Sequence, residues 1–157
     1  MVRDKVVDTH ILAEILKQFN PRFPNNGLVK NELLKSSFIN LLNPSIISDG
    51  YEGKIVASIF AFIEIYNKFD EISDKLFTKE KVYNFIRQSP EWFVIEDINM
   101  ETIFHYNQLP KKSQKGEELA VEDAVHVATT MLRGPNSILI TKDHVIHDMR
   151  IDNIEVV

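Results

Sequence analysis

The chain has 157 residues, of which 44% are hydrophobic and 26% charged, a balance typical of one globular domain rather than of a disordered chain. It contains no cysteine, which excludes disulfides, thiolate zinc sites and cysteine nucleophiles. The formal net charge of −5 argues against a broad basic surface for nucleic acid, but it does not exclude an acidic site at which a divalent metal reverses the local charge.

The sequence predicts a soluble, cytoplasmic protein. Its first residues, MVRDKVVDTH, lack the apolar core and the small-residue cleavage site of a signal peptide. The longest nearly apolar run, Ile55 to Tyr66, covers 12 residues, whereas a membrane-spanning helix needs about 20. We therefore expect no membrane-spanning segment.

In chain order, the first half of the sequence predicts one strand, several helices and two long loops. We expect a strand over Val2–Val7 and a helix over Thr9–Gln18. The segment NPRFPNNG is dense in Pro, Asn and Gly and is expected to be a loop. A helix over Leu28–Leu42 and a second loop, NPSIISDGYEG, follow it. Lys54–Phe69 is expected to form one strongly apolar helix, and Phe77–Gln88 another.

The second half alternates predicted strands and helices. Glu91–Glu96 (EWFVIE) is aromatic and β-branched, which predicts a strand. Met100–Leu109 is expected to be a helix that Pro110 ends, and the basic loop PKKSQKGEE follows. The remaining predicted elements are a helix over Val121–Arg133 closed by Gly134, strands over Ser137–Thr141 and Ile154–Val157, and a short helix over His144–Met149. Short apolar strands that alternate with helices predict an α/β fold with a parallel sheet covered on both faces.

Two aspartates lie at or just beyond the ends of predicted strands. Asp8 comes at the end of the first strand and Asp143 shortly after SILIT, and each precedes a predicted helix. In open parallel sheets, functional groups gather beyond the carboxyl ends of the strands, which favours a site there. Helix capping is the alternative for each residue taken alone, because aspartate is a good N-cap.

Glu64 is the one charged residue in the run from Ile55 to Tyr66. A helix that is apolar all round is buried, so we expect Glu64 to be buried as well. A buried carboxylate is costly unless it is paired, protonated or bound to a metal. Lys68 lies one helical turn further on, and an ion pair with it is the alternative to a functional role.

The predicted helix VEDAVHVATTMLRG carries two adjacent acids that differ in their neighbours. Glu122 stacks with Glu118 and His126, a polar stripe that we expect to be solvated, whereas Asp123 lies on an apolar flank beside Ala120. If either acid is a ligand, it should therefore be Asp123. The expected core face of this helix consists of Val121, Ala124, Val125, Ala128, Met131 and Leu132.

Three aspartates and one glutamate in semi-buried positions cannot all be ionised near one another without cations. Oxygen ligands in a chain without cysteine suit Mg²⁺ or Mn²⁺. Such a cluster prepares a water nucleophile and stabilises an in-line displacement at phosphorus. Sequence spacing alone leaves open whether the four side chains converge.

Four stretches of the chain resemble the PIN domain, the nuclease fold that includes the VapC-type toxins of toxin–antitoxin pairs. VVDTHILAEIL resembles the opening strand, first acid and helix of the family, and SIFAFIEIY resembles the helix with its second acid. VEDAVHVATTMLRGPNSILITKDHVI resembles the C-terminal half, and IDNIEVV the closing strand. The resemblance implies a three-layer α/β/α PIN-like fold with a central, mostly parallel sheet. It also implies a single domain over residues 1–157, with a helical insertion around residues 20–53.

The resemblance further implies divalent-metal-dependent hydrolysis of RNA phosphodiesters that leaves a 5′-phosphate. The implied partners are an RNA substrate, an antitoxin protein and a second copy of the chain. The residues that match the metal-binding, catalytic acids of the family are Asp8, Glu64, Asp123 and Asp143, which would hold Mg²⁺ or Mn²⁺. The residues expected to support them are Thr141, Thr9 and His10, of which the last stands where the family often has Asn.

Several basic residues are candidates for contact with the RNA backbone, although ordinary solvated surface is the favoured interpretation, because exposed lysine is common. These residues are Lys111, Lys112, Lys115, Arg133 and Lys142. From a different functional class, an inactive PIN-like scaffold that binds RNA or a protein is the main alternative.

Three other kinds of site fit the sequence less well. A haloacid-dehalogenase-like phosphatase requires an aspartate where His10 stands, and a receiver domain leaves Glu64 without a role. His144 and His147 are three residues apart but lack a third predicted zinc ligand.

Overall fold

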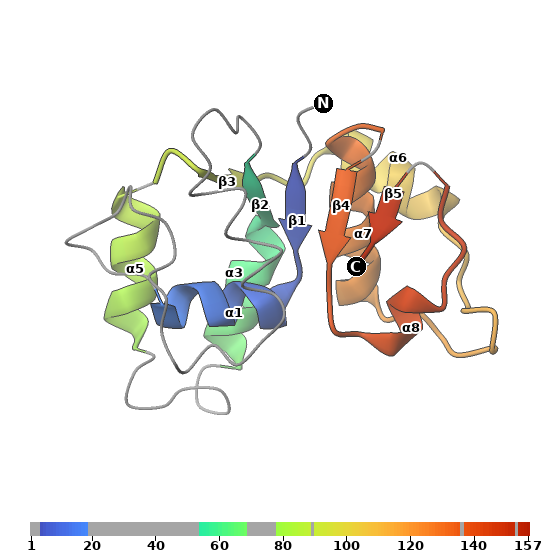
Figure 1. Cartoon of the computed structure of the whole chain (residues 1–157), viewed down its shortest axis with the longest axis horizontal. Coiled ribbons are helices and arrows are strands. Elements are labelled where there is room, and N and C mark those ends of the chain that lie inside the picture. Colours follow the sequence, from blue (N-terminus) through green and yellow to red (C-terminus); the bar gives the residue numbers. More distant parts are fainter. Residues whose placement is uncertain (1–3, 19–53, 69–77, 89, 136, 153) are drawn as a thin grey trace.

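The computed structural model describes residues 4–18, 54–68, 78–88, 90–135, 137–152 and 154–157. Its strands form one five-stranded sheet in the order β3-β2-β1-β4-β5, and each neighbouring pair is parallel (Figure 1). The strands are β1 (Lys5–Val7), β2 (Ile55–Ser58), β3 (Phe93–Glu96), β4 (Ser137–Ile140) and β5 (Ile154–Val156). The predicted α/β class with a central parallel sheet is confirmed.

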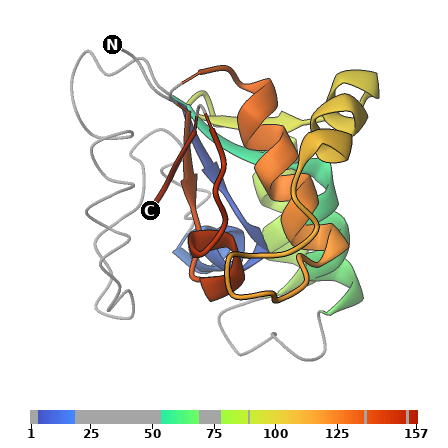
Figure 2. The ribbon, with the colours of Figure 1, turned by 90° about the vertical axis from the view of Figure 1, so that its right-hand side faces the viewer.

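The helices lie on both faces of this sheet. They are α1 (Thr9–Gln18), α3 (Ile59–Asn67), α5 (Lys79–Gln88), α6 (Met100–Gln108), α7 (Val121–Leu132) and the short α8 (His144–His147). Figure 2 shows α6 and α7 together on one side of the strands. None of the helices in the described part of the chain is long and apolar enough to cross a membrane.

The alternation of side chains along the strands divides the apolar core in two. Val6 of β1 packs in a cluster with Val127 of α7, and the next residue, Val7, packs in another with Leu12 of α1. Successive strand residues point to opposite faces of a sheet, so each central strand supplies both clusters. This burial on both faces explains why the central strands are continuously apolar in sequence.

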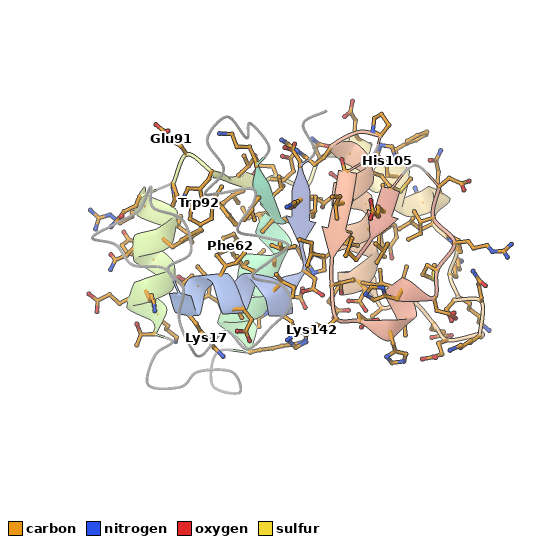
Figure 3. The ribbon with its side chains drawn as sticks, viewed as in Figure 1. Lys17, Phe62, Glu91, Trp92, His105 and Lys142 are labelled. Carbon is orange, nitrogen blue, oxygen red and sulfur yellow. The ribbon has the colours of Figure 1, made fainter. Side chains whose placement is uncertain are left out.

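Aromatic rings dominate the cluster on the α1 and α5 side. The ring centroids of Phe85 and Phe93 lie 4.7 Å apart with the rings nearly perpendicular, a favourable edge-to-face arrangement. Phe62 and Trp92 belong to the same cluster, on the α5 side of the sheet (Figure 3). These rings fix α3 and α5 relative to β3.

The prediction of one helix over Lys54–Phe69 is wrong over its first turn, because Ile55–Ser58 forms β2. Periodicity cannot separate a short buried strand from a buried helix within a continuous apolar run. The Ser58 side chain accepts a hydrogen bond from the Phe60 amide at 3.1 Å and so begins α3. The helix is also not buried all round, since Ile63 is 48% exposed.

The other predicted elements in the described residues are present, with ends that differ by a few residues. The predicted strand at Glu91 begins at Phe93, and the helix predicted to end at Met149 ends at His147. The loops predicted on either side of Leu28–Leu42, that helix itself and the insertion over 20–53 lie outside the described residues. The single domain over residues 1–157 stays a prediction.

Candidate active site

The order in which the chain adds strands to the sheet reverses between β1 and β4, which makes this position the topological switch point of the sheet. From β1 the chain adds β2 and β3 on one side, then returns to add β4 and β5 on the other. In open parallel sheets, ligands bind beyond the carboxyl ends of the strands at such a point. Asp8 directly follows β1, and Thr141 and Asp143 follow β4, so they flank the switch.

A pocket of about 260 Å³ opens beside these strand ends. All four acids singled out in the sequence line it, although they come from widely separated parts of the chain. The lining residues are Asp8, Thr9, His10, Ala13, Glu64, Lys68, Ala120, Glu122, Asp123, His126 and Asp143.

Asp8 and Asp143 are connected through the hydroxyl of Thr141. This hydroxyl donates a hydrogen bond to Oδ2 of Asp8 and accepts one from the Asp143 amide at 3.0 Å. Oδ1 of Asp8 accepts from the Ile11 amide at 2.9 Å, and Oδ1 of Asp143 accepts from the Val145 amide at 2.8 Å. The capping alternative is therefore confirmed for both aspartates, which also border the pocket.

Glu64 is only 8% exposed and is held by three side chains. Its Oε1 accepts a hydrogen bond from the Thr9 hydroxyl at 2.6 Å and lies 3.2 Å from Nε2 of His126, while Oε2 is 3.8 Å from Nζ of Lys68. Burial alone raises the pKa of the Glu64 carboxyl, but the hydrogen bonds from His126 and Thr9 and the charges of His126 and Lys68 outweigh it. The net effect is a lowered pKa, so Glu64 is a carboxylate at neutral pH.

His126 is the pocket residue that the sequence analysis missed. The prediction of a solvated stripe is wrong for it, because its exposed fraction is only 1%. A carboxylate only accepts hydrogen bonds, so a hydrogen bond to Glu64 requires a proton on Nε2 of the imidazole. Nδ1 of the same ring is buried and has no hydrogen-bond partner in the part of the chain that the structure describes. The sequence did contain one indication of this role, because His126 lies three residues after Asp123 and therefore on the same side of α7.

Asp123 carries the clearest electrostatic effect in the pocket. Burial, followed by the negative charges of Asp143, Asp8 and Glu64, raises the pKa of its carboxyl to about 6, against the opposing effect of His126. The four acids are thus close enough for their charges to repel one another. A group that supplies positive charge to the pocket would relieve this repulsion.

The donor chemistry of the pocket fits a hard divalent cation. Its acids offer carboxylate oxygens, the ligands that Mg²⁺ and Mn²⁺ prefer, and their mutual repulsion calls for a positive charge. As the side chains lie, no group of three acidic or histidine residues within the described ranges could hold one ion. Asp8 and Asp143 instead use carboxylate oxygens to cap helices.

Other predicted site residues lie at the pocket or away from it. Thr9 and His10 line it, and Lys142 is exposed next to Asp143, below the carboxyl end of β4 (Figure 3). Arg133 lies at the opposite end of α7, where its guanidinium contacts Asp4 at 2.6 Å and Glu96 at 3.0 Å.

The remaining lysines and the histidine pair are not in this pocket either. Lys111 and Lys112 line a separate cavity, and the Lys115 amide donates to Oδ2 of Asp148 at 3.0 Å. His144 lies 3.0 Å from Glu117, whereas His147 contacts the Thr141 carbonyl at 2.8 Å. The two histidines thus have separate partners and do not share a ligand position.

Comparison with known proteins identifies the fold. No family model matches the sequence, and no curated protein matches it. Among solved structures, the chain matches one in the crystal structure of VapBC2 from Rickettsia felis bound to a DNA fragment from their promoter. The two chains are 17% identical with a TM-score of 0.59, and the match covers 100% of this chain and 98% of the other. At this level of identity the likeness concerns the fold, and it agrees with the predicted three-layer PIN-like architecture.

Proposed function

We propose that the protein is a divalent-metal-dependent endoribonuclease that hydrolyses RNA phosphodiester bonds. The observation that carries the proposal is the convergence of Asp8, Glu64, Asp123 and Asp143 on one pocket at the switch point of the sheet. The raised pKa of Asp123 supports it, because it reflects burial and the negative charges of Asp143, Asp8 and Glu64, which the charge of His126 only partly offsets. Perturbed carboxyl groups in a cleft are typical of functional sites.

Each residue has a defined part in this proposal. The four acids would hold Mg²⁺ or Mn²⁺, which when bound supplies acidity to water and positive charge beside the phosphate. Thr141 orients Asp8 and the Asp143 backbone, while Thr9 and His126 orient Glu64. These contacts would hold the carboxylates in place before substrate arrives, and Lys142, which is exposed next to Asp143, would contact the RNA backbone.

A role as the toxin of a toxin–antitoxin pair is the biological context that we favour. The fold match to a chain of the Rickettsia felis VapBC2 structure supports it, together with the sequence resemblance to VapC-type toxins. In this context the protein binds an antitoxin, forms a homodimer and acts on RNA in the cytoplasm.

One observation favours a second candidate, an inactive PIN-like scaffold that binds RNA or a protein. No three acids in the described residues are arranged to hold one ion, and two of them serve as helix caps. In a scaffold, the acids would keep these structural roles without a metal. The two candidates differ in whether the protein cleaves RNA.

The test compares Asp8→Asn with Asp152→Asn in the presence of Mn²⁺ and a mixed RNA pool. Asp152 is exposed and precedes β5, at the sheet edge away from the pocket, so it provides a matched control. We expect wild type and Asp152→Asn to cleave RNA and Asp8→Asn to be slower by about 100-fold or more, since the carboxylate is lost as a ligand. Equal cleavage by all three would indicate a contaminating nuclease, and no cleavage by wild type would favour the scaffold.

A further inference from the structure

A second cavity, of about 370 Å³, lies between the end of α6 and the start of α7. Leu109, Leu119 and Ala124 give it apolar walls, and Tyr106 and Asn107 add an aromatic ring and an amide from α6. The volume lies within the range of about 300–1,000 Å³ that is typical of small-ligand sites. An apolar pocket with a few polar groups at its edge is the usual form of such a site.

The loop that closes this cavity is held by its own backbone hydrogen bonds. The Leu119 amide donates to the Lys111 carbonyl at 3.0 Å, and an antiparallel bridge pairs Lys112 with Glu118. Gly116, with a φ of +84°, allows the tight turn in the middle of the loop. The Lys115 amide, bonded to Asp148, fastens the loop to the end of α8. The cavity wall is therefore formed before any ligand binds.

The cavity and the acid pocket share the first turn of α7. Ala120 and Asp123 line the acid pocket, whereas Leu119 and Ala124 line the cavity. Figure 2 shows the chain running from α6 down to the loop at the start of α7. Leu119 directly precedes Ala120 and Ala124 directly follows Asp123, so the cavity and the acid pocket border the same turn, as the sites for a phosphate and a neighbouring nucleotide would.

We propose that this cavity binds an unpaired base of the RNA strand, next to the phosphate that is cut. This inference rests on the proposed ribonuclease function and extends it to a substrate subsite. Unstacked bases bind to proteins by stacking on aromatic rings, here Tyr106, and by hydrogen bonds to their edges, here from Asn107. Lys111 and Lys112 stand at the same cavity and provide positive charge for the flanking phosphates.

The test measures the binding of a fluorescein-labelled, mixed-sequence hexaribonucleotide by anisotropy at low ionic strength, with EDTA to prevent cleavage. We expect Tyr106→Ala to raise Kd roughly five- to 100-fold, since one stacked base is lost. Tyr83→Ala is the matched control, because Tyr83 is exposed on α5 and lies outside the cavity. An unchanged Kd in Tyr106→Ala, or no binding by wild type, would overturn the inference.

A second variant keeps the test decisive if Tyr106→Ala does not fold. Asn107 is exposed, so Asn107→Ala should fold normally, and we expect it also to raise Kd at least about fivefold. If Asn107→Ala binds the hexamer as wild type does, the cavity does not recognise a base.

Cleavage with Mn²⁺ separates this inference from the proposed function. We expect Tyr106→Ala to raise KM with little change in kcat, because the acids are untouched. Tyr106-dependent binding without any cleavage would refute the nuclease and leave the subsite standing. Cleavage with the same KM and Kd in wild type and Tyr106→Ala would refute the subsite and leave the nuclease standing.

Discussion

Among single residues, Asp123 responds most directly to the crowding of acids in the pocket. Burial and the neighbouring carboxylates raise its pKa from an ordinary value of 3.8 to about 6. The folded protein therefore binds more protons than the unfolded chain between these two pH values. Stability falls as the pH rises through this window, and the loss is complete once Asp123 is ionised in the folded state.

Asp123→Asn should abolish the loss of folding stability that the ionisation of Asp123 causes in the metal-free protein. We expect the variant to gain stability relative to wild type as the pH rises from 5 to 7.5, with a constant difference above that pH. Thermal unfolding in EDTA at a series of pH values measures the effect. A difference that does not vary with pH would contradict the shifted pKa, and Asp152→Asn serves as the control.

His126 illustrates how a buried neighbour can orient a site acid. Its Nε2 lies 3.2 Å from both the Glu64 carboxylate and the Thr9 hydroxyl. Replacing the partner that orients a metal ligand typically weakens metal binding about 10- to 100-fold. We expect His126→Leu to weaken Mn²⁺ binding by this factor, and His126→Gln to recover much of it because its amide can still donate.

Calorimetric titration with Mn²⁺ distinguishes this role from a purely structural one. If the ring had only a structural role, both variants would have a lower melting temperature than wild type but the same Mn²⁺ affinity as wild type. Unchanged Mn²⁺ affinity in His126→Leu would therefore count against the orientation of Glu64 by His126.

Among the elements, α7 connects the acid pocket to the far end of the sheet. Its first turn carries Asp123 to the pocket, and Arg133 at its C-cap contacts Asp4 before β1 and Glu96 at the end of β3. Arg133 was predicted to contact RNA, but in the structure its guanidinium serves these two carboxylates. The two ends of this helix therefore make different contacts, one lining the acid pocket and the other pairing with carboxylates elsewhere in the fold.

Arg133→Met should destabilise the fold without changing the acid pocket. We expect a loss of about 2 kcal/mol, the usual contribution of hydrogen bonds to charged groups, with Mn²⁺-dependent cleavage unchanged at 25 °C. Denaturant unfolding and the cleavage assay provide the two measurements, with the exposed Arg150→Met as control. Weaker RNA binding at unchanged stability would instead support the predicted RNA contact.

The elements also show what the sequence could and could not predict. Asp8 and Asp143 were identified because strand ends are visible as apolar runs that stop near a polar residue, whereas Thr141 was identified only through the resemblance to the PIN domain. The strand Ile55–Ser58 was missed because it joins the apolar start of α3 without a turn residue. Glu64 was correctly expected to be buried, although the reason given for it, an entirely apolar helix, was wrong.

The error at His126 has a different physical origin. The core face predicted for α7 was misplaced, since Val121 is 58% exposed whereas Val127, Thr129 and Thr130 are buried with His126. The hydroxyls of the two threonines donate to backbone carbonyls one turn earlier, which satisfies them without solvent. Polar residues of this kind conceal a buried face from a pattern that counts only apolar positions.

For the whole molecule, the pocket exists only in the folded state, because its residues come from both ends of the chain. A ligand that binds only the folded state stabilises it, by about 2.7 kcal/mol at 100 times its Kd. We expect Mn²⁺ to raise the melting temperature by several degrees, and Glu64→Gln to reduce this rise.

Differential scanning fluorimetry with and without Mn²⁺ measures the rise for each variant. Glu80→Gln is a suitable control, since Glu80 is exposed in the first turn of α5. The same rise in Glu64→Gln as in wild type would remove Glu64 from the metal site.

The central position of β1 has a consequence for the folding of the protein. The strand that pairs with it on one side, β4, and the Thr141 hydroxyl that donates to Asp8 both lie 133 residues further along the chain. Contacts between residues this far apart in sequence require the closure of a long loop, and proteins rich in such contacts fold slowly. Asp8 and Asp143 are therefore brought to one pocket only after β1 and β4 have paired.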